Sequence, residues 1–523
     1  MSKVVQEIVR AEPVEALHFV GPPTKARTGL RQAQAERKGG PELITLGCRL
    51  NAAESEAIRA LAADCDDLVI VNSCAVTNEA VRQTRQAIRK AKRARPNARV
   101  IVTGCAAQVE PETFAAMPEV ARVIGNREKF LAGSFKNTPF ASSEVEMRGR
   151  AQPRPSPAPA FASAQERFST SLEPNGLLPS ASPDIRVSDI MAVRETAPHL
   201  AAGFAERARA FVEVQNGCDH RCTFCIIPYG RGNSRSVPAG LVVERIKALA
   251  GEGFEEVVLT GVDVTSYGPD LPGTPSLGQL IERVLRHVPE LPRLRLSSLD
   301  CIEIDERLFD IAAHEPRFMP HLHLSIQAGD DMVLKRMKRR HSRAQAIETV
   351  ARLKAARPEI AIGADLIAGF PTETDEMHEN SLRLIDECDI VMGHVFPFSP
   401  KRGTPAARMP QVPPKVVKER ARRLREASAR RRAAWLEGLV GTRQRVLIEK
   451  YGFGHSENFA PVQLKAPPLD GEGLGWGGVS GEALRFIDST PTQTLPHQGG
   501  GLTGVVEVRI TSVEGETLLG EAL

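Results

Sequence analysis

The stretch Phe211–Cys225 reads Phe-Val-Glu-Val-Gln-Asn-Gly-Cys-Asp-His-Arg-Cys-Thr-Phe-Cys and joins a predicted strand, 211–215, to three closely spaced cysteines. Cys218, Cys222 and Cys225 have the spacing C-x3-C-x2-C. A cubane [4Fe–4S] cluster normally takes four thiolates, so three leave one iron open. An open iron can chelate a small ligand through an amine and a carboxylate. The stretch therefore predicts a catalytic iron–sulfur site directly after a strand.

Zinc binding and unrelated buried thiols are the alternative interpretations of these cysteines. A zinc site would need a fourth ligand. His220 lies within the same short loop, too close to its neighbours to serve easily. Three unrelated thiols at this spacing are favoured still less.

Three other cysteines, Cys48, Cys74 and Cys105, lie far apart in the N-terminal part of the chain. Strands are predicted at 43–46, 68–71 and 100–103, helices at 53–62 and 79–95, and a loop at 48–51. This alternation indicates a parallel α/β sheet. Each of the three cysteines comes just after a predicted strand, at the edge where open α/β sheets bind ligands. We therefore expect the three thiols to meet at one edge of that sheet.

The remaining sequence suggests further domains. The segment 204–440 alternates predicted strands and helices, as in a partial or full barrel of β/α units, and the alternating segment from 441 onward suggests a small all-β domain. The predicted organisation is a disordered extension at 1–40, an α/β domain at 41–135, a Pro/Ser/Ala-rich disordered linker at 136–203, a β/α barrel at 204–440, and an all-β domain at 441–523 with a low-complexity insertion at about 465–501.

Composition narrows the class of protein. Hydrophobic residues make up 42% of the 523 residues, enough for packed cores, and the net charge is +4. No apolar stretch reaches the roughly 18–20 residues that span a bilayer, and the N-terminus does not resemble a signal peptide. We therefore expect a cytoplasmic protein with no membrane partner, whose nine cysteines bind metal or stay as thiols. Cys65, Cys301 and Cys388 fit no motif and are expected to be ordinary thiols.

Two basic runs, 335–343 and 415–432, stand out in the charge pattern. A solvated helix face is the simpler interpretation of each run. The alternative is contact with the phosphates of a nucleic acid.

The spacing of Cys218, Cys222 and Cys225 resembles the C-x3-C-x-aromatic-C signature of the radical S-adenosylmethionine (SAM) superfamily, with Phe224 at the aromatic position. The resemblance implies that the methionine part of SAM binds the open iron. One electron from the cluster then cleaves SAM into methionine and a 5′-deoxyadenosyl radical. The cofactor carries this chemistry, while the protein supplies orientation and excludes water.

Other motifs resemble those of the methylthiotransferase family. They are Gly47–Asn51, Asn72–Thr77 and Thr103–Ala106, then Gly261–Gly268, Gln327–Gly329, Gly369–Thr374 and His394–Pro400, and finally Gly454–Val462, which resembles the RNA-binding TRAM barrel. The resemblance implies an N-terminal parallel α/β domain, a central radical SAM partial β/α barrel and a C-terminal TRAM barrel. It also implies a second [4Fe–4S] cluster on Cys48, Cys74 and Cys105, whose open iron carries the sulfur to be transferred. The SAM contacts that it implies are Phe224, Gly261, Gln327 and Asp365.

The residues after Cys48 separate the substrates within that family. Arg49-Leu50-Asn51 resembles the threonylcarbamoyladenosine tRNA methylthiotransferase (MtaB-like) group. The implied reaction adds a methylthio group to carbon 2 of N6-threonylcarbamoyladenosine at tRNA position 37, with SAM as methyl donor and radical source. Its partners would be the tRNA anticodon stem-loop, an electron donor and a sulfur source, with no role for DNA. The alternatives are methylthiolation of isopentenyladenosine in tRNA or of a ribosomal protein aspartate, or an RNA-binding protein with structural clusters.

Overall fold

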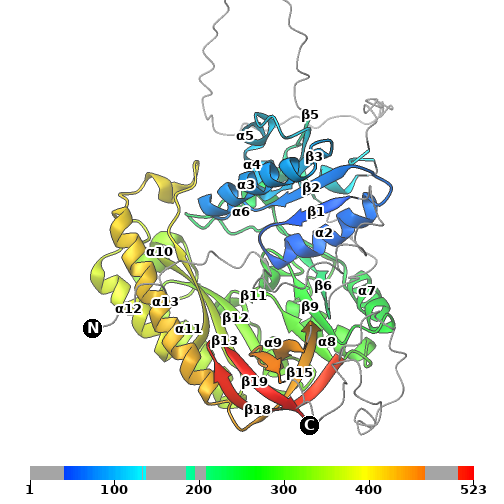
Figure 1. Ribbon diagram of the computed structural model, residues 1–523. Coiled ribbons are helices and arrows are strands. Elements are labelled where there is room, and N and C mark those ends of the chain that lie inside the picture. The colour runs from blue at the N-terminus through cyan, green and yellow to red at the C-terminus, as the bar shows by residue number, and fades with distance from the viewer. Residues whose placement is uncertain (1–40, 132, 137–183, 195–207, 451, 466–503) are drawn as a thin grey trace, which may run out of the picture.

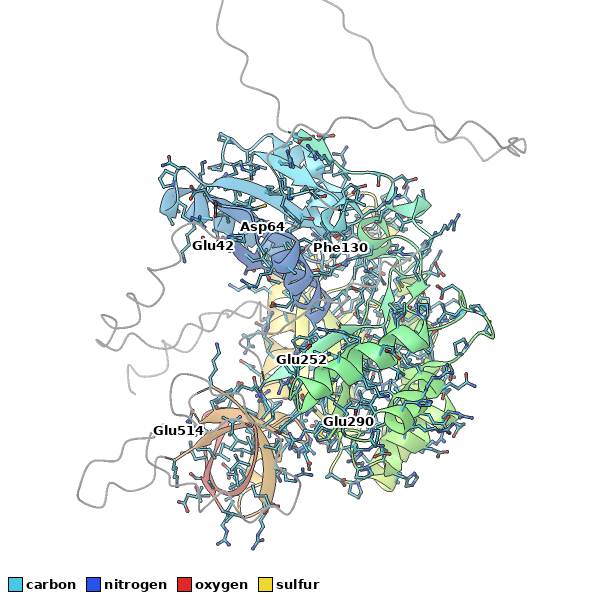
Figure 2. All side chains as sticks on the ribbon, turned by 90° about the vertical axis from the view of Figure 1, so that its right-hand side faces the viewer. Glu42, Asp64, Phe130, Glu252, Glu290 and Glu514 are labelled. Carbon is cyan, nitrogen blue, oxygen red and sulfur yellow. The ribbon has the colours of Figure 1, made fainter. Side chains whose placement is uncertain are left out.

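The computed structural model describes residues 41–131, 133–136, 184–194, 208–450, 452–465 and 504–523. The predictions for 1–40, for most of the linker and for the insertion lie outside the described residues. Three folded units lie one above the other, with the N-terminal sheet at the top of Figure 1, a barrel of β/α units in the middle and a small β-barrel below. The same order appears in Figure 2, where Asp64 and Phe130 mark the upper unit and Glu514 the lower one. No helix of the described residues is long and apolar enough to cross a membrane.

The N-terminal unit is a five-stranded, all-parallel sheet in the order β1-β2-β3-β4-β5. Its strands are β1 (Glu42–Thr45), β2 (Leu68–Ser73), β3 (Arg99–Gly104), β4 (Arg122–Ile124) and β5 (Asp184–Arg186). Its helices are α2 (Arg49–Leu61), α3 (Asn78–Ala94), α4 (Cys105–Val109) and α5 (Pro111–Ala115). In β2, Val69 and Val71 pack into the core on one face while Leu68 and Ile70 pack into the core on the other. Burial on both faces explains why this strand is continuously apolar.

Two N-terminal predictions are wrong. The loop predicted at 48–51 ends after Cys48, because that residue is extended and α2 begins at Arg49. The predicted linker 136–203 contains β5, which pairs in parallel with β4. A three-residue strand is too short to leave an alternating pattern in the sequence.

Arg122 holds β5 in place from the neighbouring strand. Its Nε atom donates to the Asp184 carboxylate at 2.8 Å, and its Nη1 atom donates to the carbonyls of Ser134 at 2.8 Å and Lys136 at 3.1 Å. One guanidinium therefore contacts the chain on both sides of residues 137–183.

The central unit is an open barrel of six parallel strands. Its strands are β6 (Arg209–Glu213), β9 (Glu256–Thr260), β10 (Arg293–Leu296) continued by β11 (Ser298–Leu299), β12 (His321–Gln327), β13 (Ala361–Ala368) and β14 (Ile390–Pro397). Its outer helices are α7 (Ala239–Gly251), α8 (Leu277–His287), α9 (Glu306–His314), α11 (Arg343–Ala356), α12 (Asp375–Glu387) and α13 (Pro414–Glu437). The strands β10 and β11 form one run, which pairs with β9 on one side and β12 on the other. The expected partial barrel is confirmed.

Successive side chains of β12 point alternately toward the outer helices and toward the space that the strands enclose. Leu322, Leu324 and Ile326 of β12 belong to the main core beneath the helices. His321 and His323, between them, face the space enclosed by the strands, here called the lumen. The interior of this barrel is therefore polar and charged, unlike a barrel whose interior is filled by apolar layers.

The C-terminal unit is a closed five-stranded barrel in the order β15-β16-β17-β19-β18, consistent with a TRAM domain. Its strands are β15 (Arg443–Lys450), β16 (Phe453–Ser456), β17 (Pro461–Leu464), β18 (Gly504–Glu514) and β19 (Thr517–Ala522). The loop between β16 and β17 places Phe459 beneath the central barrel, where its ring stacks on His321 with 5.1 Å between centroids. This unit therefore closes the floor of the lumen.

The long basic helix α13 packs along β14 and α12. Arg422 pairs with Glu419 and Glu426 of the same helix, and Arg423 pairs with Glu379 at 2.6 Å. These arginines already have acidic partners, so the simpler interpretation of this basic run fits the structure better. Phosphate binding by the helix stays a prediction.

Candidate active site between two cysteine triads

The structure brings Cys48, Cys74 and Cys105 together at the carboxyl edge of the N-terminal sheet. Gly47 has a φ of +102°, and a Cβ at that position would lie only 2.7 Å from the Cβ of Cys74. Burial, followed by the neighbouring thiols of Cys105 and Cys48, raises the pKa of the Cys74 thiol to about 12. The three thiols are thus neighbours, although they are far apart in sequence. Their role as ligands stays a prediction.

The second triad lies in the loop between β7 (Gln215–Asn216) and α6 (Ile227–Arg231). The Cys225 amide donates to the Cys222 carbonyl at 3.1 Å. The pKa of Cys225 is raised to about 12, first by burial, and in addition by Cys222 and by Cys105 of the other triad. The two triads therefore face each other across the boundary between the first two units, which we call the seam.

The donor set of each triad fits a cluster with an open iron. The remaining cysteines lie elsewhere, since Cys65 is buried in the core of the N-terminal sheet and Cys301 and Cys388 are buried in the core of the barrel. Among the described residues, neither triad has a fourth cysteine. Three thiolates are the number that leaves one iron of a cubane open.

His220 contacts carboxylates beside its triad. Its Nδ1 atom lies 3.5 Å from Asp263 and its Nε2 atom 3.6 Å from Glu303, and the bond to Glu303 is the main cause of its raised pKa. Cys218, His220 and Asp263 form a cluster of possible metal ligands. That cluster would use only one cysteine of the triad, so it does not explain the spacing of all three. Zinc remains the weaker interpretation.

A buried charge network, missed by the sequence analysis, fills the seam. Arg231 donates from Nε to the Cys105 sulfur at 3.0 Å and from Nη2 to Glu54 at 2.9 Å. Lys129 lies 2.7 Å from the same Glu54 carboxylate. All three charged side chains are at most 2% exposed. The network links one cysteine of the N-terminal triad to the helix that follows the second triad.

Arg339 belongs to the first basic run but is not solvated. It pairs with Asp300 at 2.9 Å and points Nη1 toward the Cys222 sulfur at 3.9 Å. Its side chain is only 8% exposed. The simpler interpretation of this run is therefore wrong at Arg339, which supplies positive charge beside the second triad.

The four predicted SAM contacts fall into two groups. Phe224 packs edge-on against Phe370 at 6.4 Å between centroids, in an apolar cluster that includes Ala328, the neighbour of Gln327. Gly261 follows β9, and a Cβ there would lie 2.7 Å from the Gln215 carbonyl oxygen. Gln327 ends β12 with a φ of +72°. These residues lie at the carboxyl ends of the barrel strands, beside the second triad.

Asp365 lies apart from that group, in the middle of β13. Its carboxylate is 2.9 Å from His323 and 3.4 Å from His394. Burial acts to raise the pKa of Asp365, but these histidines hold it well below its ordinary value. The structure therefore places Asp365 in the lumen, in a paired group, and its role in SAM binding stays a prediction.

Arg49 connects the N-terminal triad to the lumen. It is the residue after Cys48, and its side chain reaches the barrel, where Nη1 lies 3.5 Å from the Leu296 carbonyl of β10. Its guanidinium carbon is 5.7 Å from the centre of the Phe459 ring. Burial, followed by the charges of Arg209 and Arg295, lowers the pKa of Arg49 to about 10.

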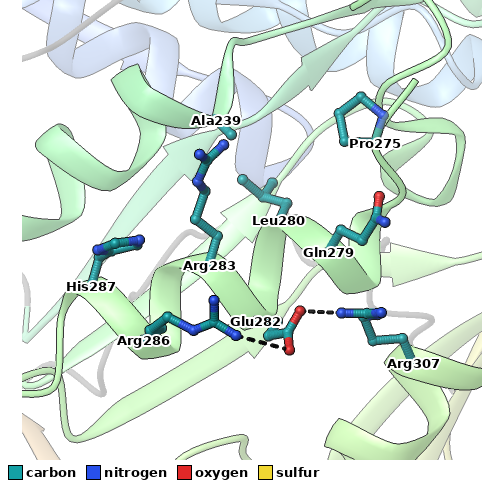
Figure 3. A pocket seen from close by; sticks show the side chains of 9 residues that line it. All are labelled: Ala239, Pro275, Gln279, Leu280, Glu282, Arg283, Arg286, His287 and Arg307. Carbon is teal, nitrogen blue, oxygen red and sulfur yellow. Dashed lines mark hydrogen bonds and ion pairs between the residues drawn. The ribbon is translucent and has the colours of Figure 1, made fainter. Parts of the chain in front are cut away.

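A separate hollow opens on the outer face of the barrel, over α8 (Figure 3). Glu282 pairs there with Arg286 and Arg307. Both arginines are already neutralised in part, and no cysteine lines this hollow. It is not part of the candidate active site.

An open β/α barrel with a C-x3-C-x2-C loop after its first strand defines a radical SAM enzyme. The model of the Radical SAM superfamily matches residues 212–385, and that of "Uncharacterized protein family UPF0004" matches residues 42–125. The superfamily match implies a [4Fe–4S] cluster and SAM as cofactors, and it confirms the predicted class.

Relatives identify the family. The chain is 49% identical to the threonylcarbamoyladenosine tRNA methylthiotransferase MtaB of Rickettsia prowazekii, over 81% of this chain and 91% of that protein. It is 31% identical to the MtaB of Aquifex aeolicus, over 80% of this chain and 95% of that protein. It is 31% identical to the tRNA-2-methylthio-N(6)-dimethylallyladenosine synthase of Erythrobacter litoralis, over 74% and 79%. The chain belongs to the MtaB family of tRNA methylthiotransferases.

Proposed function

We propose that this chain adds a methylthio group to carbon 2 of N6-threonylcarbamoyladenosine at position 37 of tRNA, with SAM as both methyl donor and radical source. The observation that carries the proposal is the pair of triads facing each other, Cys105 near Cys225, in a member of the MtaB family. Insertion of a methylthio group at a C–H bond needs a source of hydrogen abstraction and a source of sulfur. Two separate three-cysteine sites can supply both.

Each triad has a distinct role in this proposal. Cys218, Cys222 and Cys225 would hold the [4Fe–4S] cluster of the radical SAM domain, and Cys48, Cys74 and Cys105 would hold a second one. When bound, these clusters and SAM supply an electron, a hydrogen-abstracting radical and the sulfur. Phe224 and Phe370 offer an apolar wall beside the second triad. Arg339 and Arg231 place positive charge beside one thiolate of each triad.

The substrate would enter at the seam. An anticodon-loop nucleotide can be unstacked and held by its edges, as is usual for sequence-specific RNA recognition. The TRAM-like barrel offers a second contact for the anticodon stem-loop. An electron donor and a sulfur source complete the reaction, and a tRNA substrate implies a location in the cytoplasm.

Nucleoside mass spectrometry tests the proposal. In cells that lack this gene, the 2-methylthio form of threonylcarbamoyladenosine should disappear and its unmodified parent should accumulate. The wild-type gene should restore it, whereas a Cys222→Ala variant should not. Loss of the methylthio form of isopentenyladenosine instead would support the substrate of the Erythrobacter relative and overturn the proposal.

A further inference from the structure

The lumen contains one arginine that differs from its neighbours in its partners. Arg209 pairs with Glu256 at 2.8 Å and with Glu449 at 2.7 Å, and Arg295 pairs with Glu256 at 3.0 Å. In the part of the chain that the structure describes, Arg49 forms no ion pair, and its one hydrogen bond is to the Leu296 carbonyl at 3.5 Å. Its guanidinium is therefore almost fully available to a ligand.

The carboxylates near Arg49 are already committed to other groups. Glu256 lies between two arginines. Asp365 accepts from His323 and faces His394, as described above. A partly buried guanidinium without a carboxylate is costly unless an anion from outside completes the site. The charges of Glu256 and Asp365 act on Arg49 from a distance, but no described carboxylate pairs with it, so its guanidinium keeps hydrogen-bond donors for an anionic ligand.

The position of Arg49 in the chain determines which ligand can reach it. Arg49 directly follows Cys48, which is a candidate ligand of the sulfur-carrying cluster. Both side chains therefore leave the backbone at the N-terminal end of α2. In adenine, N1 lies between carbon 2 and carbon 6, and carbon 6 carries the N6 nitrogen, so carbon 2 and N6 lie on the same edge of the base. A base whose carbon 2 faces the N-terminal triad can therefore direct its N6 substituent toward the lumen.

The threonylcarbamoyl group ends in a carboxylate, whereas an isopentenyl group is neutral and apolar. Guanidinium and carboxylate groups match in shape and form two parallel charged hydrogen bonds. From this geometry we infer that Arg49 binds the carboxylate of the N6 substituent and so selects threonylcarbamoyladenosine. This inference rests on the proposed function, which it deepens by naming the group that reads the substrate.

Binding measurements that vary both the residue at position 49 and the charge of the ligand test the inference. The probes are two synthetic anticodon stem-loops that carry threonylcarbamoyladenosine, one with the free carboxylate and one with its neutral methyl ester. Binding to the anaerobic, iron-loaded wild type, Arg49→Gln and Arg49→Lys is measured. Wild type should bind the free acid more tightly than the ester by about ten-fold or more, as expected for hydrogen bonds between charged groups. In Arg49→Gln this preference should vanish, and Arg49→Lys should retain part of it.

Each outcome decides the inference. Equal weakening of both stem-loops by Arg49→Gln would show that Arg49 has only a structural role and would overturn it. If Arg49→Gln has a reduced iron content, Arg49→Lys decides the inference: a smaller but remaining preference for the acid over the ester supports it, and an unchanged preference would overturn it. Failure of the proposed function is distinguishable, because wild type would then not methylthiolate the free-acid stem-loop at all.

Discussion

The guanidinium of Arg231 lies against the carboxylate of Glu54, with Nη2 and Oε2 2.9 Å apart, and this contact joins the barrel to the N-terminal sheet. Arg231 ends the helix that follows the second triad, and Glu54 lies on the helix that begins after Cys48. The relative position of the two triads therefore depends on buried charges, which are sensitive to the loss of either partner.

We predict that Arg231→Ala lowers the free energy of unfolding by about 3 kcal/mol, because Lys129 still pairs with Glu54 but the buried acceptors on Cys105 and Asn51 lose their charged donor. Denaturant unfolding of the anaerobic protein measures this change. Arg422→Ala is the matched control, since that arginine pairs with glutamates on the surface, where solvent screens the charges and its loss should change stability little. Similar losses in the two variants would contradict a special role of the seam.

We predict that replacing Cys218, Cys222 and Cys225 together with Ala removes about half of the iron and abolishes SAM cleavage, because the other triad is a separate site. Replacing Cys48 and its two partners should also remove about half of the iron but leave SAM cleavage intact. Iron analysis and detection of 5′-deoxyadenosine measure the two effects. Cys65→Ala, in the core of the N-terminal sheet, should keep all of the iron. Complete loss of iron in either triple variant would refute independent sites.

The lumen should make the protein sensitive to acid. Burial, followed by the charge of Arg295, lowers the pKa of His321 well below its ordinary value. The neutral ring is therefore retained in the folded state, while the unfolded chain takes up a proton below about pH 6.5. Stability from this group is present above pH 6.5 and is lost as the pH falls, at up to about 1.4 kcal/mol per pH unit.

Unfolding free energies between pH 7.5 and 5 check this dependence. His321→Asn should flatten the slope, whereas His287→Asn, at an exposed position on α8, should leave it unchanged. Glu256 adds a second loss at lower pH. Burial acts to raise the pKa of Glu256, but Arg295 and Arg209 hold it far below the usual value, so its contribution fades only below about pH 4.5. A stability that rises on acidification would contradict this assignment.

We predict that Phe459→Ala loosens the contact between the TRAM-like barrel and the floor of the lumen. The ring stacks on His321 and on His455, and Arg295 lies 4.9 Å from its centre. Loss of these contacts should cost about 2–3 kcal/mol, somewhat less than for a fully buried phenylalanine. Faster proteolytic release of the C-terminal barrel would report the change. Val440→Ala, an exposed position between α13 and β15, should have no comparable effect.

Local patterns predicted much of this molecule. The strands before Cys48, Cys74 and Cys105 are recognisable because each is a short apolar run followed by a break, and a parallel sheet then requires their ends to meet. The spacing of the second triad was enough to indicate its chemistry. The sequence predicts a helix from residue 53, whereas α2 begins at Arg49. Arg49 and Asn51 face the seam, and contacts of this kind leave no pattern in the neighbouring sequence.

Contacts between distant segments were beyond the reach of such patterns. Glu54 and Lys129 meet within the N-terminal unit, and Arg231 joins them only because the two units pack together. The residues around each of the three give no sign of these partners. Arg339 was counted in a basic run, although its burial beside Cys222 sets it apart from its neighbours. Phe459 was part of a recognised motif, but its place in the floor of the barrel depends on how that unit docks.

The bonds of Arg122 have a consequence for how this chain can change over evolutionary time. Because one guanidinium contacts both Lys136 and Asp184, the two ends of the segment between them are held at a single residue of the sheet. The entropy of closing a loop grows only with the logarithm of its length, about 0.6 kcal/mol for each doubling. Insertions at this place are therefore thermodynamically cheap, and new sequence can accumulate there while the distance between the two triads stays the same.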